Sequence, residues 1–200
     1  MPKIVDHARR REEIAQLAVS VIQREGAEAA TVRRIAREGG FSIGVLSHYF
    51  RGKDELIVFA FQWIASRTFA DLAARVKAAE PGLARLRAAL EFMLPAPGAD
   101  SFIAVWFGLW GGAVHNPALA QVHRNYYARW RRCVGRCLAE AVQRGQVPGP
   151  VFVRDTTDLL VSGVDGLWIG AAFESGRFPA RRRRALVDRL IAGVVGGSRA

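Results

Sequence analysis

The sequence predicts an all-α fold made of a three-helix N-terminal head and a six-helix body. Three observations support this prediction. Apolar residues recur with a period of about 3.6 in almost every segment, whereas the alternation typical of strands is scarce. Short breakers rich in Gly and Pro separate the periodic segments. Half of the 200 residues are apolar, which is enough to bury a substantial core.

The three helices of the head are expected before residue 53. The first carries one apolar stripe, formed by Ile14, Leu17, Ala18, Val21 and Ile22. Gly26 is placed to end this helix with a positive φ angle. Thr31 and Ser42 have hydroxyl groups suited to capping the second and third helices, and Gly39-Gly40 separates those two helices.

The six helices of the body are predicted at about 53–79, 83–94, 101–113, 117–145, 155–175 and 180–195. Asn116-Pro117 predicts a helix start, because Asn is a good N-cap and Pro fits the first helical position. Breakers at 147–150 and 175–179 separate the last three helices. The chain is therefore expected to divide into a domain at 1–52 and a domain at 53–200.

The chain is strongly basic, with a net charge of +11 and an isoelectric point of about 11.0. A polyanionic partner is expected, with nucleic acid ahead of a membrane surface. The excess charge is not concentrated in the head, since residues 1–56 hold ten Lys and Arg against eight Asp and Glu. Residues 57–200 hold nineteen against ten. Charge alone therefore does not identify a DNA-binding surface.

Targeting and redox features are few. The first twenty residues lack the apolar stretch of a secretory signal. The longest uncharged apolar run, Ser101–Val114, is shorter than the roughly 20 residues that span a bilayer. Two cysteines, Cys133 and Cys137, are too few for a disulfide framework. We therefore expect a soluble, cytoplasmic protein with no membrane partner.

Five positions in the head have the spacing of a DNA-binding helix-turn-helix. They are Ala36, Gly40, Ser42, Leu46 and Phe50. A small residue lets two helices cross closely, a Gly permits the positive φ angle of the turn, and the last two residues anchor the second helix. The spacing predicts that this second helix, the recognition helix, enters a major groove, which is about 12 Å wide.

The outward face of the recognition helix is uncharged, and Gly44 allows its backbone to approach DNA. Ile43 and Val45 suit thymine methyl groups, and Ser47 and His48 suit hydrogen bonds. A base and a phosphate fit His48 equally well. Flanking residues are expected to contact phosphates. The full set of expected DNA contacts is Thr31, Arg33, Arg34, Ser42, Ile43, Gly44, Val45, Ser47, His48, Tyr49 and Lys53.

Aromatic residues gather in the body, which holds four of the five tryptophans beyond residue 100. Such stripes are more often core than ligand pocket, and both interpretations stay open. A quaternary ammonium would gain about 0.5–2 kcal/mol for each cation–π contact, with Asp165 or Glu91 as counter-charge. An apolar drug-like or acyl effector fits the same residues. The candidate ligand-binding residues are Phe102, Trp106, Phe107, Trp110, Tyr126, Tyr127, Trp130, Asp165 and Trp168.

The last two predicted helices are expected to form a homodimer, because both have broad apolar faces. Gly163, Gly166 and Gly170 would let helices approach closely. Two such pairs about a two-fold axis make a four-helix bundle. Two heads in successive major grooves, about 34–36 Å apart, require a near-palindromic operator. The candidate interface residues are Leu160, Val164, Leu167, Leu186, Leu190 and Val194.

Three further clusters are assigned mainly structural roles. Arg9–Arg11 form either an arm on the DNA or a solvated helix start, which is slightly favoured. The arginines at 129, 131, 132 and 136 are expected to be mostly surface, with an anionic effector as the alternative. Cys133 and Cys137 favour a buried pair over a metal or redox site, because no third ligand is evident. No metal and no cofactor are therefore expected.

The head, with "SHYFRGKDELI" at 47–57, resembles the TetR family of one-component transcriptional regulators. The segments "WFGLWGGAVHNPAL" at 106–119 and "VDGLWIGAAFESG" at 164–176 are similar to the branch that represses the choline-to-betaine pathway. This resemblance implies a homodimer whose body binds an effector that alters the spacing of the heads. By matching position, it implies DNA contacts from Thr31, Arg33, Ser42, Gly44, Ser47, His48, Tyr49 and Lys53.

The leading hypothesis is a ligand-responsive repressor, released from double-stranded DNA by a small molecule. An enzyme is not favoured, because the sequence has no nucleophile elbow, P-loop, dinucleotide fingerprint or metal-ligand spacing. The alternative is a basic helical protein that docks to membranes or to protein partners without sequence-specific DNA binding.

Overall fold

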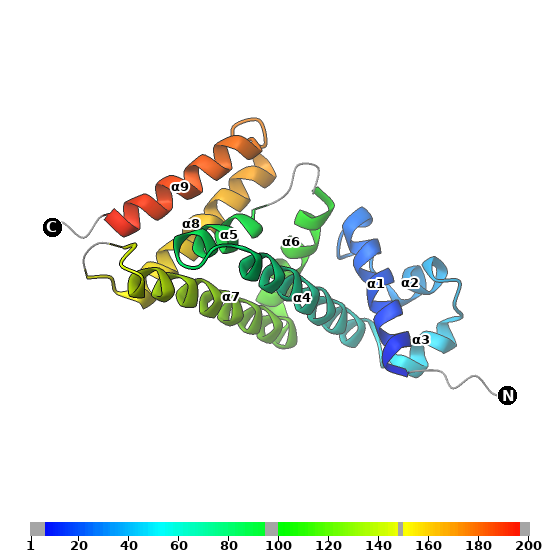
Figure 1. The fold of residues 1–200 in the computed structure, drawn as a ribbon. Coiled ribbons are helices and arrows are strands. Elements are labelled where there is room, and N and C mark those ends of the chain that lie inside the picture. Colours follow the sequence, from blue (N-terminus) through cyan, green and yellow to red (C-terminus); the bar gives the residue numbers. More distant parts are fainter. Residues whose placement is uncertain (1–6, 95–99, 148–149, 197–200) are drawn as a thin grey trace. The chain divides into compact units, whose positions relative to one another are not determined.

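The protein is helical throughout the residues that the computed structural model describes, which are 7–94, 100–147 and 150–196. Side chains are described for 7–94, 103–147 and 150–193. No strand occurs among these residues, which confirms the all-α prediction (Figure 1). Every predicted helix is present, with ends displaced by no more than two residues in the body. The helices are α1 (His7–Glu25), α2 (Val32–Glu38), α3 (Ile43–Tyr49), α4 (Lys53–Ala78), α5 (Leu83–Phe92), α6 (Asp100–His115), α7 (Pro117–Gln143), α8 (Val153–Phe173) and α9 (Ala180–Gly196).

Contacts divide the chain into two compact units, which are described separately below. Unit 1 comprises residues 1–68 and 100–126, and unit 2 comprises residues 69–99 and 127–200. Unit 1 therefore holds α1, α2, α3, α6 and the first parts of α4 and α7. Unit 2 holds the remaining parts of α4 and α7 with α5, α8 and α9. The expected boundary between residues 52 and 53 concerns a division of function, and it stays a prediction.

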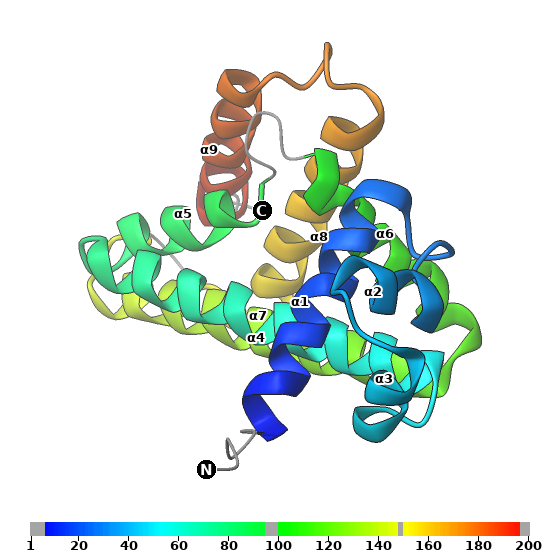
Figure 2. The same ribbon diagram turned by 90° about the vertical axis from the view of Figure 1, so that its right-hand side faces the viewer.

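In unit 1, helices α1, α2 and α3 pack against one another (Figure 2). Their shared core includes Ile14, Ile22, Ile35 and Leu46, all of which are buried. Helix α6 also lies against α1. The approach is close at Gly108, where a Cβ atom would lie 2.9 Å from the Cβ atom of Ala27.

The turns of the head follow the sequence prediction. Gly26 ends α1 with a φ angle of 85°, and Gly40 has a φ angle of 65° between α2 and α3. Both predicted caps are confirmed: Thr31 Oγ1 accepts a hydrogen bond from the Arg34 amide at 3.1 Å, and Ser42 Oγ accepts one from the Val45 amide at 3.3 Å. These caps fix where α2 and α3 begin.

In unit 2, α8 and α9 lie side by side, and α5 contacts both (Figure 1). A Cβ atom at Gly163 would lie 2.6 Å from Leu190 Cδ2, so any larger residue here would require the Leu190 side chain to move. The predicted close approach at Gly163 is therefore present within the chain. Leu160, Val164 and Val187 are buried in the same unit.

Helix α4 is long and apolar enough to cross a membrane by length and composition, with a mean hydropathy of 1.2 in its most apolar window. The core helix of a soluble protein passes the same test of length and composition. Leu56, Phe61 and Leu72 on α4 are almost fully buried in the protein. Their burial supports a core helix, because a lipid-facing helix would present these side chains outward.

Candidate DNA-binding and ligand-binding sites

The recognition helix is α3, and its two faces differ as predicted. Leu46 and Phe50 are buried and anchor it to the rest of the head. Ile43 is 48% exposed and Val45 is 39% exposed. Ser47 is also exposed. Because the outward face carries no formal charge, its backbone can approach a base-pair edge without displacing bulky ionic side chains.

The polar side chains of α3 retain hydrogen-bonding capacity. The Ser47 hydroxyl donates to the Ile43 carbonyl oxygen at 3.1 Å, which leaves its own oxygen available as an acceptor. The His48 ring lies near two others, with centroid distances of 5.2 Å to Tyr49 and 5.3 Å to His7. His7 is the first residue of α1, and no pattern in the sequence predicts a role for it. The imidazole ring of His7 therefore lies next to that of His48 on α3.

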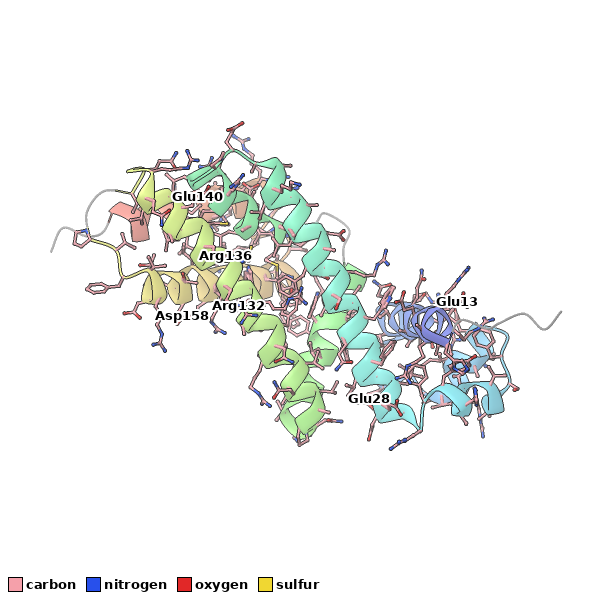
Figure 3. All side chains as sticks on the ribbon, turned by 60° about the horizontal axis from the view of Figure 1, so that its bottom comes forward. Glu13, Glu28, Arg132, Arg136, Glu140 and Asp158 are labelled. Carbon is pink, nitrogen blue, oxygen red and sulfur yellow. The ribbon has the colours of Figure 1, made fainter. Side chains whose placement is uncertain are left out.

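Residues expected to contact phosphates flank α3. Thr31 and Arg33 are exposed, and Tyr49 is half-buried. Lys53 begins α4, and its Nζ atom donates to the Glu28 carbonyl oxygen at 3.5 Å, near the labelled Glu28 in Figure 3. That hydrogen bond is long, so the ammonium group can turn toward an anion at little cost.

Arg34 differs from these residues, because acidic neighbours bind its guanidinium group. Its Nη1 atom donates to Glu38 Oε2 at 2.7 Å, and its Nε atom donates to Glu25 at 3.1 Å. The hydrogen bond from Arg34 lowers the pKa of Glu25. Arg34 therefore joins α1 to α2 in this structure. It would have to exchange carboxylate partners to bind a phosphate.

Arg11 is neither the DNA arm nor the solvated helix start that the sequence suggested, because other residues of the head bind its side chain. Its Nη1 atom donates to the Tyr49 carbonyl oxygen at 2.7 Å, and its Nη2 atom donates to Glu55 Oε1 at 3.1 Å. The guanidinium group lies 4.3 Å from the centroid of the Phe50 ring. Arg11 thus connects α1, the end of α3 and α4. The sequence Arg9–Arg11 does not indicate which of the three side chains packs against the head.

Four of the aromatic residues predicted to bind a ligand form two pairs in unit 1. The Trp106 and Tyr126 rings lie 4.3 Å apart, and the Phe107 and Trp110 rings lie 5.4 Å apart in an edge-to-face arrangement. Trp106 and Tyr126 are buried. The side chain of Phe102 lies outside the described residues. The first pair is packed as expected for a core, whereas Phe107 and Trp110 are half-buried.

The other candidates lie in unit 2, where three of them form a polar and aromatic cluster. The Tyr127 hydroxyl donates to Asp165 Oδ1 at 3.0 Å, and the Tyr127 and Trp130 rings lie 5.8 Å apart. We call Tyr127, Trp130 and Asp165 the unit 2 cluster. Trp168 is one turn along α8 from Asp165 and is buried. The cluster joins α7 to α8.

Burial controls the chemistry of the unit 2 cluster. It raises the pKa of Asp165 to about 6, although the hydrogen bond from Tyr127 acts in the opposite direction. The pKa of Tyr127 is raised as well, first by burial and then by the charge of Asp165. The indole Nε1 atom of Trp130 is buried and has no hydrogen-bond partner among the described residues. The cluster therefore combines a carboxyl group whose charged form is destabilised by burial, that of Asp165, with an indole N–H donor that has no partner among the described residues, that of Trp130.

Comparison with known proteins identifies the family. Residues 82–196 match the family described as "BetI-type transcriptional repressor, C-terminal", and residues 14–58 match "Bacterial regulatory proteins, tetR family". The chain belongs to the TetR family. Its C-terminal part is of the BetI type, as the resemblance implied. It is a helix-turn-helix, DNA-binding transcription regulator and not an enzyme.

Relatives of this TetR-family chain match along nearly its whole length. The HTH-type transcriptional regulator BetI of Proteus mirabilis is 28% identical over 96% of this chain and 94% of its own length. A transcriptional regulator from Saccharomonospora viridis, solved in complex with choline, is 22% identical and covers 92% of this chain and 96% of its own, with a TM-score of 0.84. A regulator from Pseudomonas aeruginosa is 22% identical and covers 98% of this chain and 94% of its own, with a TM-score of 0.83.

TetR-family regulators act as dimers, and the structure revises which residues of this one are open to a partner. Leu160 and Val164 are buried within the chain itself, so their side chains cannot also pack on a second copy. Leu167, Leu186 and Leu190 are half-buried, and the side chain of Val194 lies outside the described residues. The exposed large apolar side chains of α8 and its N-cap are instead Phe152, Leu159, Ile169 and Phe173.

Proposed function

We propose that this TetR-family chain is a cytoplasmic, homodimeric repressor that binds a near-palindromic operator and leaves it when a small cationic molecule binds the body. The observation that carries the DNA-binding half is the exposed, uncharged outer face of α3, held in place by the buried Leu46 and Phe50. The domains at 1–52 and 53–200 would divide these two tasks.

In the proposed mode of DNA binding, one set of residues selects the base sequence and another set binds the phosphate backbone. Ile43 and Val45 would contact thymine methyl groups, and Ser47 and His48 would accept or donate hydrogen bonds at base edges. Thr31, Arg33, Ser42, Tyr49 and Lys53 would bind phosphates around them. Such contacts position a protein without selecting sequence. Gly44 would keep the backbone close to the groove.

The proposed effector is a quaternary ammonium with a hydroxyl group, of which choline is the simplest probe. The Asp165 carboxylate would offer the counter-charge, and the Trp130 ring beside Tyr127 would offer a face to a cation. The Tyr127 ring already has a cation near it, because the Arg131 guanidinium carbon lies 5.4 Å from its centroid. The unused Nε1 donor of Trp130 would be satisfied by the hydroxyl oxygen of the ligand. The choline complex of the Saccharomonospora viridis regulator supports this choice.

Two linked measurements test the proposed function. The full chain is used to select duplexes from a random pool, and the selected consensus is titrated by fluorescence anisotropy. A near-palindrome with preferred bases in each half-site is expected. Enrichment without a two-fold consensus would overturn the operator proposal.

The second measurement adds choline to the complex, with dimethylbutanol, its neutral carbon isostere, as the matched control. Choline is expected to release the DNA, and the isostere to require at least about tenfold more ligand, because each cation–π contact contributes about 0.5–2 kcal/mol. Asp165→Asn should reduce this difference. Equal potency of the two compounds would show that charge plays no part in recognition.

A further inference from the structure

A second feature of unit 2 lies apart from the unit 2 cluster: an open cleft of about 530 Å³ bordered by α4, α5 and α7. Its walls include Val76, Lys77, Arg85, Cys133, Arg136 and Cys137. A smaller cleft of about 200 Å³ lies beside it and shares Cys133 and Arg136. Cys133 therefore lines both clefts.

The surroundings of Cys133 are positively charged. Glu140 is the one carboxylate among the residues that line the larger cleft, and it forms an ion pair with Arg85 at 3.0 Å. Lys77, Arg132 and Arg136 are exposed and form no ion pair within the described part of the chain. Arg132, Arg136 and Glu140 follow one another along α7, as Figure 3 shows. The clefts around Cys133 therefore attract small anions.

The two thiols are not equivalent. Cys133 is half-buried and Cys137 is buried one turn further along α7. A hydrogen bond from Cys137 lowers the pKa of Cys133 to about 7, and the charge of Arg136 acts in the same direction. A thiolate is the reactive form of cysteine, and partly exposed, electropositive surroundings are typical of reactive cysteines. These surroundings distinguish Cys133 from an inert core thiol.

We propose that Cys133 is a site of covalent modification by small, negatively charged disulfides. The Cys133 thiolate attacks one sulfur atom of the small disulfide, whose S–S bond breaks. A new S–S bond joins that half to Cys133, and the other half leaves as a thiolate, so no further oxidant is needed. The larger cleft holds the attached half, with Lys77 and Arg136 facing its negative charge.

The geometry of α7 favours this mixed disulfide over a bond between the two cysteines. Residues four apart on a helix have Cβ atoms about 5–6 Å apart. A disulfide needs them about 3.5–4.5 Å apart. Closing a Cys133–Cys137 bond would distort a turn of α7, so Cys137 is not expected to displace the attached group.

The test uses the intact chain and two chromogenic disulfides of different charge. Dithiobisnitrobenzoate is dianionic at neutral pH and dithiodipyridine is neutral, and both release an absorbing thiol. The rate ratio of the anionic to the neutral probe is expected to exceed that of a small free thiol by about tenfold, the lower end of electrostatic steering. High salt should reduce the ratio, and mass spectrometry should locate the adduct on Cys133.

Matched variants separate the contributions. Cys133→Ser should abolish the fast reaction. Cys137→Ala should slow it at neutral pH, whereas Cys137→Ser keeps a hydroxyl donor and should preserve most of it. Arg136→Gln should lower the charge preference more than Arg154→Gln, which removes an exposed arginine on α8. A thermal melt of each variant separates loss of folding from loss of reactivity.

Three results would overturn the proposal. They are an adduct located on Cys137, a charge preference no greater than that of the free thiol, and a Cys133–Cys137 disulfide as the main product. The reaction requires neither operator nor effector, so its outcome is independent of the proposed function.

Discussion

The Arg11 guanidinium group donates a hydrogen bond of 2.7 Å to the carbonyl oxygen of Tyr49, 38 residues further along the chain. Tyr49 is the last residue of α3, so this bond satisfies a carbonyl group at the end of the recognition helix. Glu55 holds the other side of the same guanidinium group. The orientation of α3 therefore depends on a residue near the start of α1.

We expect Arg11→Leu to lower the free energy of unfolding by about 1–3 kcal/mol, because it removes hydrogen bonds that involve charged groups. Arg11→Lys keeps the charge but lacks the planar fork and should recover only part of the loss. Chemical denaturation measures both. Arg9→Leu is the control, since Arg9 is exposed and its ion pair with Glu13 lies on the surface. Equal losses at positions 9 and 11 would contradict a specific role for Arg11.

Lys53→Ala should weaken binding to all DNA sequences and reduce the slope of log affinity against log salt by about one, as expected for one lost phosphate contact. Ser47→Ala should leave that slope unchanged and alter which bases are preferred. The measurement is anisotropy at several salt concentrations on selected and random duplexes. A loss that is the same on every sequence for both variants would mean that α3 does not read bases.

Choline binding should weaken as the pH falls through about 6, because burial raises the pKa of Asp165 to about 6 and protonation removes the counter-charge. Asp165→Asn should bind more weakly at neutral pH and show no such pH dependence. Calorimetric titration across this range checks both. If the affinity of the wild-type chain were constant, Asp165 would not face the cation.

The Asp165 carboxyl group also affects folding stability, and here the pH dependence is opposite to that of choline binding. Its folded pKa lies above the unfolded value of about 4, so the folded protein binds more protons between pH 4 and pH 6. Stability should therefore fall as the pH rises through this window. Asp165→Asn should remove this fall and be relatively more stable at neutral pH. If the stability of the wild-type chain rose between pH 4 and pH 6 and that of the Asp165→Asn chain did not, the raised pKa of Asp165 would be contradicted.

Neighbouring residues of α8 should give different results on substitution. Leu159 is 59% exposed and Leu160 is fully buried. Leu159→Glu should dissociate the dimer while the monomer stays folded, whereas Leu160→Ala should cost about 2–5 kcal/mol of stability. Sedimentation and thermal melts distinguish the two effects. Val114→Glu changes an exposed residue of α6 and is the control. A Leu159→Glu chain that remains dimeric would exclude this face of α8 from the interface.

The sequence predicted the helices well because their signals are local. Thr31 and Ser42 are caps that act on amides three residues away, and Gly40 has the positive φ angle that its position requires. These signals do not depend on the rest of the fold. The helix-turn-helix could therefore be located from spacing alone.

The pairing of distant side chains could not be predicted in the same way. Nothing near Arg34 in the sequence indicates that Glu25 would bind it, and Arg11 cannot be distinguished from Arg9 and Arg10 by composition. Apolar periodicity also does not tell whether a face packs on its own chain or on a partner. Leu160 and Leu159 differ in this respect although both are leucines in one apolar segment.

The uncharged outer face of α3 has a consequence for how the regulator responds to its surroundings. In the proposed mode of binding, phosphate attraction comes from flanking residues and is similar for every duplex, so added salt would weaken cognate and competing complexes by a similar factor. Discrimination between them would rest on uncharged contacts and would stay nearly constant. Ionic strength would therefore set how much of the operator is occupied and leave the choice of operator unchanged.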